Sequence, residues 1–289
     1  MKLSAIAPWF GSKRTLAPRI VEALGPHTAY WEPFCGSLAV LLAKPIATME
    51  TVNDLHGDLI NLARVLQSEN LARQLYEELK RTLMHEKLFC EAARRCLDRG
   101  RTPAADEPEL QRAVDFMICS WFGRNGVAGT ESYNQGFCVR YTKNGGHAAT
   151  RWVSAVESIP EWHERLRGIT ILYRDGLDLI DKIEDNHGVV VYCDPPYVVK
   201  GAKYVYDFYE VHHRRLAEAL SRFKKTRCVV SYYENSLVNK LYESWTKISC
   251  PVAKSLSNQR MRGQRGERTM APEVLFINDH NMETGRQLF

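Results

Sequence analysis

Four consecutive residues could bind an amino group: Asp194, Pro195, Pro196 and Tyr197. An amino group needs hydrogen-bond acceptors, and this segment combines acceptors with an aromatic ring. The segment follows the apolar run 189–193, which is predicted to be a buried central strand. Ligand sites in open α/β sheets lie at the carboxyl ends of strands. Because proline cannot continue the ladder, the Pro195 carbonyl and the Asp194 carboxylate are free to accept amino hydrogens, and Tyr197 is placed to stack on a base. The alternative is a strand end closed by a proline turn, with a solvated aspartate.

Two further positions suit a ligand that contains a ribose. Gly36, in the loop after an expected strand, lets the backbone approach a ligand closely. Asp54 ends the next expected strand, where a carboxylate accepts both ribose hydroxyls in dinucleotide-binding folds. The alternatives are a simple strand–helix turn at Gly36 and a helix N-cap at Asp54.

The elements that must position these residues alternate between strand and helix. Apolar and β-branched runs predict strands at residues 28–32, 48–52, 169–173, 188–193, 227–232, 248–252 and 273–277. Helical spacing of apolar residues predicts helices at residues 38–43, 55–66, 110–121, 177–183, 211–223 and 236–245. This alternation predicts a largely parallel, doubly wound α/β sheet with helices on both faces.

The stretch between the second and third of these strands differs from the rest. Residues 71–122 are amphipathic and helical in pattern, with a polar interruption at 100–108. Residues 123–150 are rich in glycine, asparagine, serine and threonine, without a clear period, and are predicted to be a functional loop or irregular subdomain. We therefore predict a catalytic domain at 1–70 and 151–289 and an insertion at 71–150.

Four segments together resemble, in their order along the chain, the motifs of the Dam-type, alpha-group N6-adenine-specific DNA methyltransferases. They are the N-terminal segment 8–14, the loop 32–39, the helical insertion and the motif 194–197. The resemblance extends from Pro8 to Ile277 and is strongest at residues 8–13, 32–66 and 189–197. It implies a Rossmann-like sheet of seven strands, one of them antiparallel, and S-adenosylmethionine as methyl donor. It departs from the family pattern at Leu38, where a second glycine is common.

The resemblance also implies a role for each site residue. Asp194 and Pro195 would bind the target amino group, with Pro196 and Tyr197 completing the catalytic motif, and no nucleophilic cysteine is required. The implied cofactor-binding residues are Trp9, Gly11, Lys13, Glu32, Phe34, Gly36, Asp54, Asp175 and Asp194. Without the resemblance, Trp9 and Lys13 would be a packed anchor and a surface charge.

A methyltransferase that acts on a base within duplex DNA must flip that base out and must contact phosphates. The resemblance implies that the insertion recognises the target, with Arg124 and Asn125 as candidates for base contacts and Arg140 and Lys143 for phosphates. The basic stretch 254–268, which includes Arg260 and Arg262, is a second DNA-binding candidate, and its alternative is a solvated loop.

For three further aromatic residues, the sequence pattern does not define a role. Tyr232 ends an expected strand and either lines the target-base pocket or packs beneath the sheet. His212 and His213 lie at a predicted helix start, and we expect surface residues without a role.

Composition sets the remaining limits. The net charge of +5 and pI near 8.7 are compatible with a polyanionic partner such as double-stranded DNA. None of the eight cysteines forms a Cys-x-x-Cys pair, so we expect free thiols and no metal. No apolar run reaches the roughly 20 residues of a membrane span, and we expect a cytoplasmic protein of a bacterial or phage-infected cell, monomeric or weakly dimeric.

Two other functions stay open at this stage. An amino-methyltransferase could act on RNA adenine, cytosine N4 or a protein glutamine, although such families more often have Asn or Ser before Pro-Pro-Tyr. A catalytically silent DNA-binding subunit is the alternative of a different class, and the intact motif from Asp194 to Tyr197, together with Lys13, argues against it.

Overall fold

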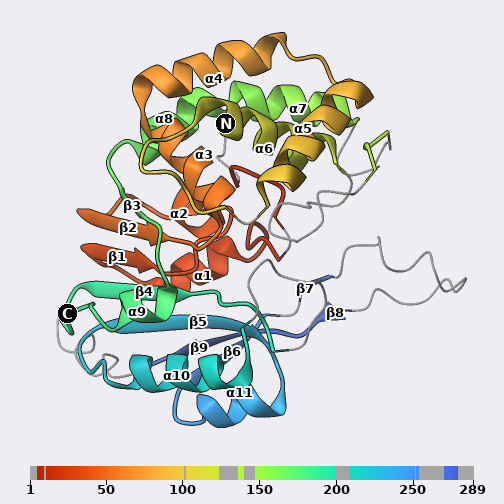
Figure 1. The fold of residues 1–289 in the computed structure, drawn as a ribbon. Helices are drawn as coiled ribbons and strands as arrows, with labels where there is room; N and C mark the ends of the chain where they lie inside the picture. The colour runs from red at the N-terminus through yellow and green to blue at the C-terminus, as the bar shows by residue number, and fades with distance from the viewer. Residues whose placement is uncertain are drawn as a thin grey trace, which may run out of the picture.

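The computed structural model describes residues 5–9, 11–100, 102–123, 136–139, 147–198, 208–250, 252–253 and 270–278. Within them, seven strands form one sheet: β1 (Ala29–Glu32), β2 (Met49–Asn53), β3 (Thr170–Leu172), β4 (Val189–Cys193), β5 (Arg227–Tyr233), β6 (Thr246–Ser249) and β9 (Glu273–Ile277). Their order across the sheet is β3-β2-β1-β4-β5-β9-β6 (Figure 1). Only β9 runs against the others in this sheet, which confirms the predicted seven strands with one antiparallel. A separate two-stranded ladder joins β7 (Val252–Ala253) to β8 (Met270–Ala271).

The central strand β4 is buried because both faces of the sheet are covered. Successive side chains of a strand point to opposite faces. Accordingly, Val190 and Tyr192 belong to one hydrophobic cluster, and Val191 and Cys193 belong to the other. The continuous apolar run that predicted this strand therefore reflects burial from two sides.

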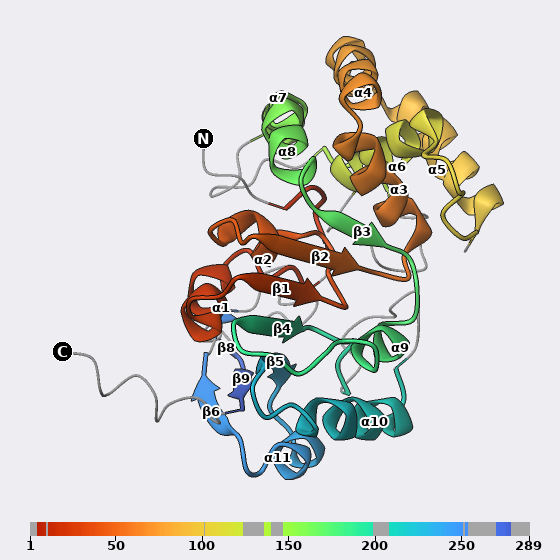
Figure 2. The ribbon, with the colours of Figure 1, turned by 90° about the vertical axis from the view of Figure 1, so that its left-hand side faces the viewer.

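Helices supply the two covering layers. On one face lie α1 (Ala17–Leu24), α2 (Ala39–Ala43) and α3 (Gly57–Gln67), whose buried residues join the first cluster. On the other lie α9 (Gly176–Ile180), α10 (Glu210–Ser221) and α11 (Ser236–Leu241), which join the second. Figure 2 shows α1 and α2 on one side of the sheet and α9 and α10 on the opposite side. This is the doubly wound arrangement that the sequence predicts.

A layer of helices lies between α3 and β3 in the chain and extends the molecule beyond the β3 edge of the sheet (Figure 1). It consists of α4 (Glu69–Arg81), α5 (Glu86–Arg99), α6 (Leu110–Phe122), α7 (Ala148–Glu157) and α8 (Ile159–Leu166). The boundary predicted at residue 150 falls inside α7, and the helical layer continues through α8. The helices α1, α7 and α8 were not predicted from the sequence.

Buried ion pairs fix this layer against the sheet domain. Arg112 on α6 donates from Nε to Asp58 Oδ1 on α3 at 2.6 Å, and both side chains are 3% exposed. Within the layer, Arg95 on α5, whose side chain is 41% exposed, donates to the buried Asp115 on α6 at 2.7 Å. A buried pair broken on one side leaves an uncompensated charge, so such pairs strongly favour one geometry. These contacts hold α3, α5 and α6 in one arrangement.

In the part of the chain that the structure describes, no helix has the length and apolar character that a bilayer crossing requires. The eight cysteines are free thiols, and all except Cys90 are buried.

Candidate active site

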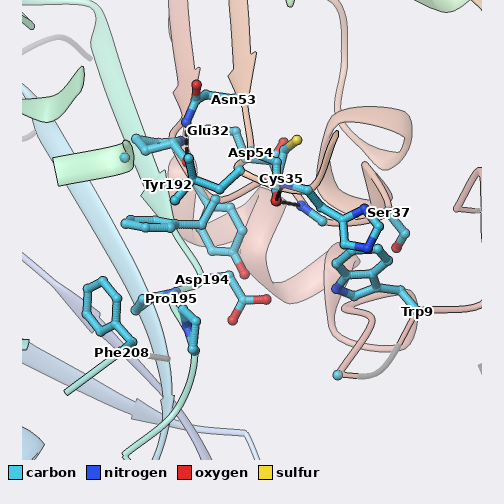
Figure 3. A pocket seen from close by; sticks show the side chains of 18 of the residues that line it. Trp9, Glu32, Cys35, Ser37, Asn53, Asp54, Tyr192, Asp194, Pro195 and Phe208 are labelled. Atoms are coloured by element: carbon cyan, nitrogen blue, oxygen red, sulfur yellow. Dashed lines mark hydrogen bonds between the residues drawn. The ribbon is translucent and has the colours of Figure 1, made fainter. Parts of the chain in front are cut away.

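A cavity of about 480 Å³ opens at the carboxyl ends of β1, β2 and β4. Figure 3 shows that Glu32, Asp54 and Asp194 surround it together, although they come from three different strand ends. Eleven of the predicted catalytic and cofactor residues line this cavity: Trp9, Gly11, Lys13, Glu32, Phe34, Gly36, Asp54, Asp175, Asp194, Pro195 and Pro196. Tyr197 is not among the lining residues.

The loop after β1 turns tightly at Gly36. Gly36 has φ of +46°, and a Cβ at this position would lie 2.9 Å from Trp9 Nε1. Leu38 is the one non-glycine residue with positive φ in the described part of the chain, at +62°. A glycine is common at this position in the family pattern, and the backbone here keeps the left-handed conformation that glycine adopts most easily.

Asp54 is held by backbone amides rather than by side chains. Its Oδ2 accepts from Gly36 N–H at 2.8 Å and its Oδ1 accepts from His56 N–H at 2.9 Å. The alternative of a helix cap at Asp54 is wrong, because the residue that caps α3 is His56, which accepts from Leu59 N–H. Burial raises the pKa of the Asp54 carboxyl, although the two amides oppose the shift. The loop therefore presents a fixed carboxylate to the cavity.

Glu32 is a buried acid with unused hydrogen-bonding capacity. It is 2% exposed, and among the described residues no donor reaches its Oε2. Burial raises the pKa of the Glu32 carboxyl to about 8, because the charged form loses its hydration. An unsatisfied buried carboxylate that lines a cavity is suited to a cationic ligand.

These residues fit S-adenosylmethionine, the cofactor implied by the sequence. Glu32 offers an acceptor for the ammonium group of its methionine part, and Asp54 offers acceptors for the ribose hydroxyls. Trp9 and Phe34 give the cavity apolar walls. A Cβ on Gly176 would lie 2.7 Å from the Phe34 ring, so the glycine permits the close packing of the α9 start on that ring.

Asp175 both caps a helix and lines the cavity. Its Oδ1 caps α9 by accepting from Leu177 N–H at 2.8 Å and Asp178 N–H at 3.1 Å. It also lines the cavity. Its predicted contact with the adenine of the cofactor stays a prediction.

Asp194 is oriented by side chains from other parts of the sequence. Lys13 Nζ lies 2.9 Å from Asp194 Oδ2, and Ser231 Oγ donates to Asp194 Oδ1 at 2.8 Å. The Tyr192 hydroxyl lies 2.9 Å from Ser231 Oγ, so the consistent arrangement has Tyr192 donating to Ser231 and Ser231 donating to Asp194. Because 21% of the Asp194 side chain stays exposed, the carboxylate is accessible from the cavity.

Lys13 and Tyr197 are packed against each other. Lys13 Nζ lies 4.8 Å from the centroid of the Tyr197 ring and also donates to the Gly11 carbonyl at 2.9 Å. The Tyr197 hydroxyl donates to Glu273 Oε2 at 2.8 Å, and the residue is 6% exposed. Stacking of Tyr197 on a target base therefore stays a prediction.

Several residues of the site were missed or misjudged from the sequence. His213 was expected at the surface but is fully buried, with Nδ1 2.8 Å from the Tyr232 hydroxyl, and burial lowers its pKa to about 4. His212, also expected to have no role, lines the cavity with Phe208. Tyr232 packs beneath the sheet, as one of its two alternatives predicts. Helical spacing could have identified the inward face of α10, which includes His213 and Leu216.

The predicted DNA contacts lie outside the described residues: Arg124, Asn125, Arg140, Lys143, Arg260 and Arg262. Across the residues that are described, no group of three or more His, Cys, Asp or Glu side chains is arranged to hold a metal ion.

A family model and a curated protein that match this chain are both described as DNA adenine methyltransferases. A family model described as D12 class N6 adenine-specific DNA methyltransferase matches residues 9–261. The Retron Ec67 DNA adenine methylase of Escherichia coli is 24% identical over 287 residues, which cover 96% of this chain and 92% of that protein.

Solved structures align at much lower similarity. A precorrin-6Y C5,15-methyltransferase from Geobacter metallireducens is 8% identical over 91% of this chain and 85% of its own, with a TM-score of 0.35. A magnesium protoporphyrin IX methyltransferase from Synechocystis with bound cofactor is 9% identical over 92% and 79%, with a TM-score of 0.33. The family model matches residues 9–261, which is most of the sequence. The chain therefore belongs to the D12 class of N6 adenine-specific DNA methyltransferases, with S-adenosylmethionine as its cofactor.

Proposed function

We propose that this enzyme transfers a methyl group to the N6 amino group of an adenine that is flipped out of double-stranded DNA, and that Asp194 and the Pro195 carbonyl hold that amino group. One observation supports the proposal most strongly. The partly exposed Asp194 carboxylate lies in the same cavity as Glu32 and Asp54, whose environments suit the cofactor. Donor and acceptor sites therefore meet in one cavity.

The cofactor side of the cavity positions the methyl donor. Glu32 takes the ammonium group, Asp54 takes the ribose hydroxyls, and Trp9 covers the methionine end. When bound, S-adenosylmethionine supplies a methyl group on a positively charged sulfur, which is an electrophile. Trp9 and Phe34 form apolar walls on this side of the cavity.

The target side orients the nucleophile. The amino group of adenine donates one hydrogen to Asp194 and one to the Pro195 carbonyl, which directs the nitrogen lone pair toward the methyl group. As the bond from nitrogen to the methyl carbon forms, the bond from that carbon to sulfur breaks, and the surplus amino proton leaves through its hydrogen bond to Asp194. Ser231 and Lys13 hold Asp194 in place for this contact. No covalent bond to the protein forms, which agrees with the burial of Cys35 and Cys193 and with their raised thiol pKa values, caused mainly by desolvation.

Access to the amino group requires base flipping, because the reacting nitrogen is stacked and paired in a duplex. The insertion at 71–150 is the proposed recognition segment, with Arg124 and Asn125 contacting bases or the orphaned partner, and Arg140 and Lys143 contacting phosphates. Arg260 and Arg262 in the basic stretch 254–268 would add phosphate contacts.

The test is expression in a bacterial host that lacks adenine methylation. Genomic DNA is digested to nucleosides, the methylated nucleoside is identified by mass, and intact DNA is sequenced with a modification-sensitive reader. We expect N6-methyladenine in a defined sequence context, and none with an empty vector. Methylation of cytosine N4 alone, or methylated RNA with unmodified DNA, would overturn the proposal.

A further inference from the structure

Glu273 is a buried acid that neither the cofactor site nor the target site uses. It begins β9, the antiparallel strand, where it pairs in register with Tyr233 of β5. The residue is 7% exposed, and its Oε2 accepts from the Tyr197 hydroxyl at 2.8 Å. Burying a carboxylate is costly unless it is paired, so the position calls for a physical reason.

That reason is visible in the charges around Lys13. Lys13 Nζ lies 2.9 Å from Asp194 Oδ2 and 3.9 Å from Glu273 Oε1, so one buried cation faces two carboxylates. Aromatic rings enclose the group: Lys13 Nζ lies over Tyr197, and the Tyr197 ring contacts Tyr233 edge-on, with centroids 4.6 Å apart. We name these five residues the Lys13 cluster.

Glu273 thus contacts Lys13, which pairs with Asp194, and Tyr197, which follows Asp194 in the same loop. Through Tyr197 it holds the end of the Asp-Pro-Pro-Tyr loop, and through Lys13 it supplies the second negative charge that keeps the ammonium buried. On the basis of the proposed role of Asp194, we propose that Glu273 is a positioning residue, which fixes Lys13 and Tyr197 so that Asp194 stays aimed at the target amino group.

The electrostatics of the cluster agree with this geometry. Burial lowers the pKa of Lys13, but attraction to Asp194 and Glu273 raises it more, so the net shift is upward. Burial raises the pKa of Glu273, which Lys13 and the Tyr197 hydroxyl oppose and Asp194 reinforces. The titratable groups that face Glu273 are Lys13 from the N-terminal segment, Asp194 and Tyr197 from the loop after β4, and Tyr233 from β5. Loss of the Glu273 charge should therefore lower the pKa of Lys13.

The experiment compares Glu273→Gln with the matched control Glu234→Gln. Glutamine keeps the shape of the side chain and its amide oxygen still accepts from Tyr197, but the charge is lost. Glu234 is an exposed glutamate at the end of β5, paired with Lys247, and lies outside the cluster. Single-turnover methyl transfer is measured across pH, and the Lys13 side chain is titrated by NMR in the cofactor-free protein.

For Glu273→Gln we expect a rate about tenfold lower, a cofactor KM within about twofold of wild type, and an alkaline limb shifted down by about half a pH unit. The Lys13 titration should shift in the same direction, and Glu234→Gln should match the wild type in all measurements. A purely structural glutamate would lower the rate equally at every pH. An unshifted profile together with an unchanged Lys13 titration would overturn the proposal.

A second variant keeps the test decisive if Glu273→Gln fails to fold. Tyr197→Phe removes only the hydroxyl that Glu273 accepts from and leaves both charges, so we expect a rate loss of about threefold without a shift of the alkaline limb. A Tyr197→Phe protein with the wild-type rate would contradict the link between Glu273 and the loop. The Lys13 titration does not depend on enzyme activity. If the pKa of Lys13 shifts in Glu273→Gln but the wild type does not methylate adenine, the proposed function is refuted while the contacts of the Lys13 cluster are supported.

Discussion

The two acids at the ends of β2 and β4 are held in different ways. Asp54 is held by the backbone amides of Gly36 and His56. Asp194 is held by two side chains, those of Lys13 and Ser231. Both acids line the same cavity, one on the side proposed for the cofactor and the other on the side proposed for the target base.

This difference separates what each half of the cavity depends on. Backbone donors depend on the path of the chain, which is set locally by the positive φ of Gly36 and Leu38. Side-chain donors depend on residues that the fold brings together from distant segments, and they can also tune charge. We therefore expect substitutions in the cofactor half to change cofactor affinity, and substitutions in the target half to change the rate of transfer.

The largest expected effect is that of Asp194→Ala. The variant removes the acceptor for the amino group, so transfer should fall by about a thousandfold or more, while the fold stays intact and cofactor affinity stays within about tenfold. The control is Asp181→Ala at the end of α9, where the acid is exposed and bound to Arg215. Radiolabelled methyl transfer and isothermal titration give both quantities. Transfer at near wild-type rate would refute the role of Asp194.

Glu32→Gln should change cofactor affinity, because Glu32 lies in the cofactor half of the cavity. Below about pH 8 the ligand-free Glu32 is mostly protonated, because burial raises its pKa to about 8. An ammonium ligand favours the ionised form, so binding should release a proton, and wild-type affinity should rise about tenfold per pH unit between roughly pH 6 and 7.5. Glu32→Gln should bind about thirtyfold more weakly near pH 8 and lose this dependence.

Calorimetry in buffers of different ionisation enthalpy counts the released protons. Glu22→Gln, at an exposed position of α1, is the matched control. Wild-type binding that is independent of pH and releases no proton would exclude the ammonium contact.

Ser231→Ala sharpens the contrast with a smaller effect. It removes the donor to Asp194 Oδ1 and leaves the buried Tyr192 hydroxyl without its partner. The transfer rate should fall about tenfold, with cofactor affinity unchanged, because only the target acid loses a contact. Ser221→Ala, an exposed serine of α10, should have no effect on either quantity. A loss of cofactor affinity with an unchanged rate would reverse the assignment of the two halves.

Gly36→Ala should give the smallest change. The added Cβ would lie 2.9 Å from Trp9 Nε1 at a φ of +46°, so the loop must shift and weaken the amide contact to Asp54. We expect cofactor affinity to fall about fivefold and stability by about 1 kcal/mol, with the rate at saturating cofactor retained. Gly168→Ala, where a Cβ meets open space, is the control for thermal melting and titration. A reduced rate at saturating cofactor, with unchanged cofactor affinity, would contradict the assignment of Gly36 to the cofactor half of the cavity.

Much of the sheet follows from the sequence because the strands β4, β5 and β9 are largely buried on both faces. The predicted strand at 273–277 matches β9, and the one at 188–193 differs from β4 by one residue. The family resemblance implied one antiparallel strand without identifying it, since a single strand's pattern does not define its direction. The structure shows that this strand is β9. Polar residues directly after β2 and β4 were also predictable, because strand ends in such sheets face the same edge.

The missed helices had usable patterns. In α7, the buried residues Trp152, Ala155 and Val156 follow helical spacing, and in α8 Ile159 and Trp162 do the same. Both helices are short, and the glycine- and asparagine-rich run before them favoured a loop. Their burial arises from packing between helices, which local propensity does not describe.

The contacts around Asp194 could not be predicted. Ser231 is 37 residues from Asp194, and Glu273 is 76 residues from Tyr197. Their meeting depends on the register of β5 with β4 and of β9 with β5, together with the side-chain rotamers at those positions. Lys13 lines the cavity, and its predicted contact with the cofactor stays a prediction, but its pairing with Asp194 at 2.9 Å was not predicted.

The most direct measurement is a crystal structure of the enzyme with duplex DNA and S-adenosylhomocysteine, which lacks the transferable methyl group. We expect one adenine outside the helix, with N6 about 3 Å from both the Asp194 carboxylate and the Pro195 carbonyl and facing the cofactor sulfur. An adenine that remains stacked in the duplex, or an N6 that lies away from Asp194, would contradict the proposed mechanism.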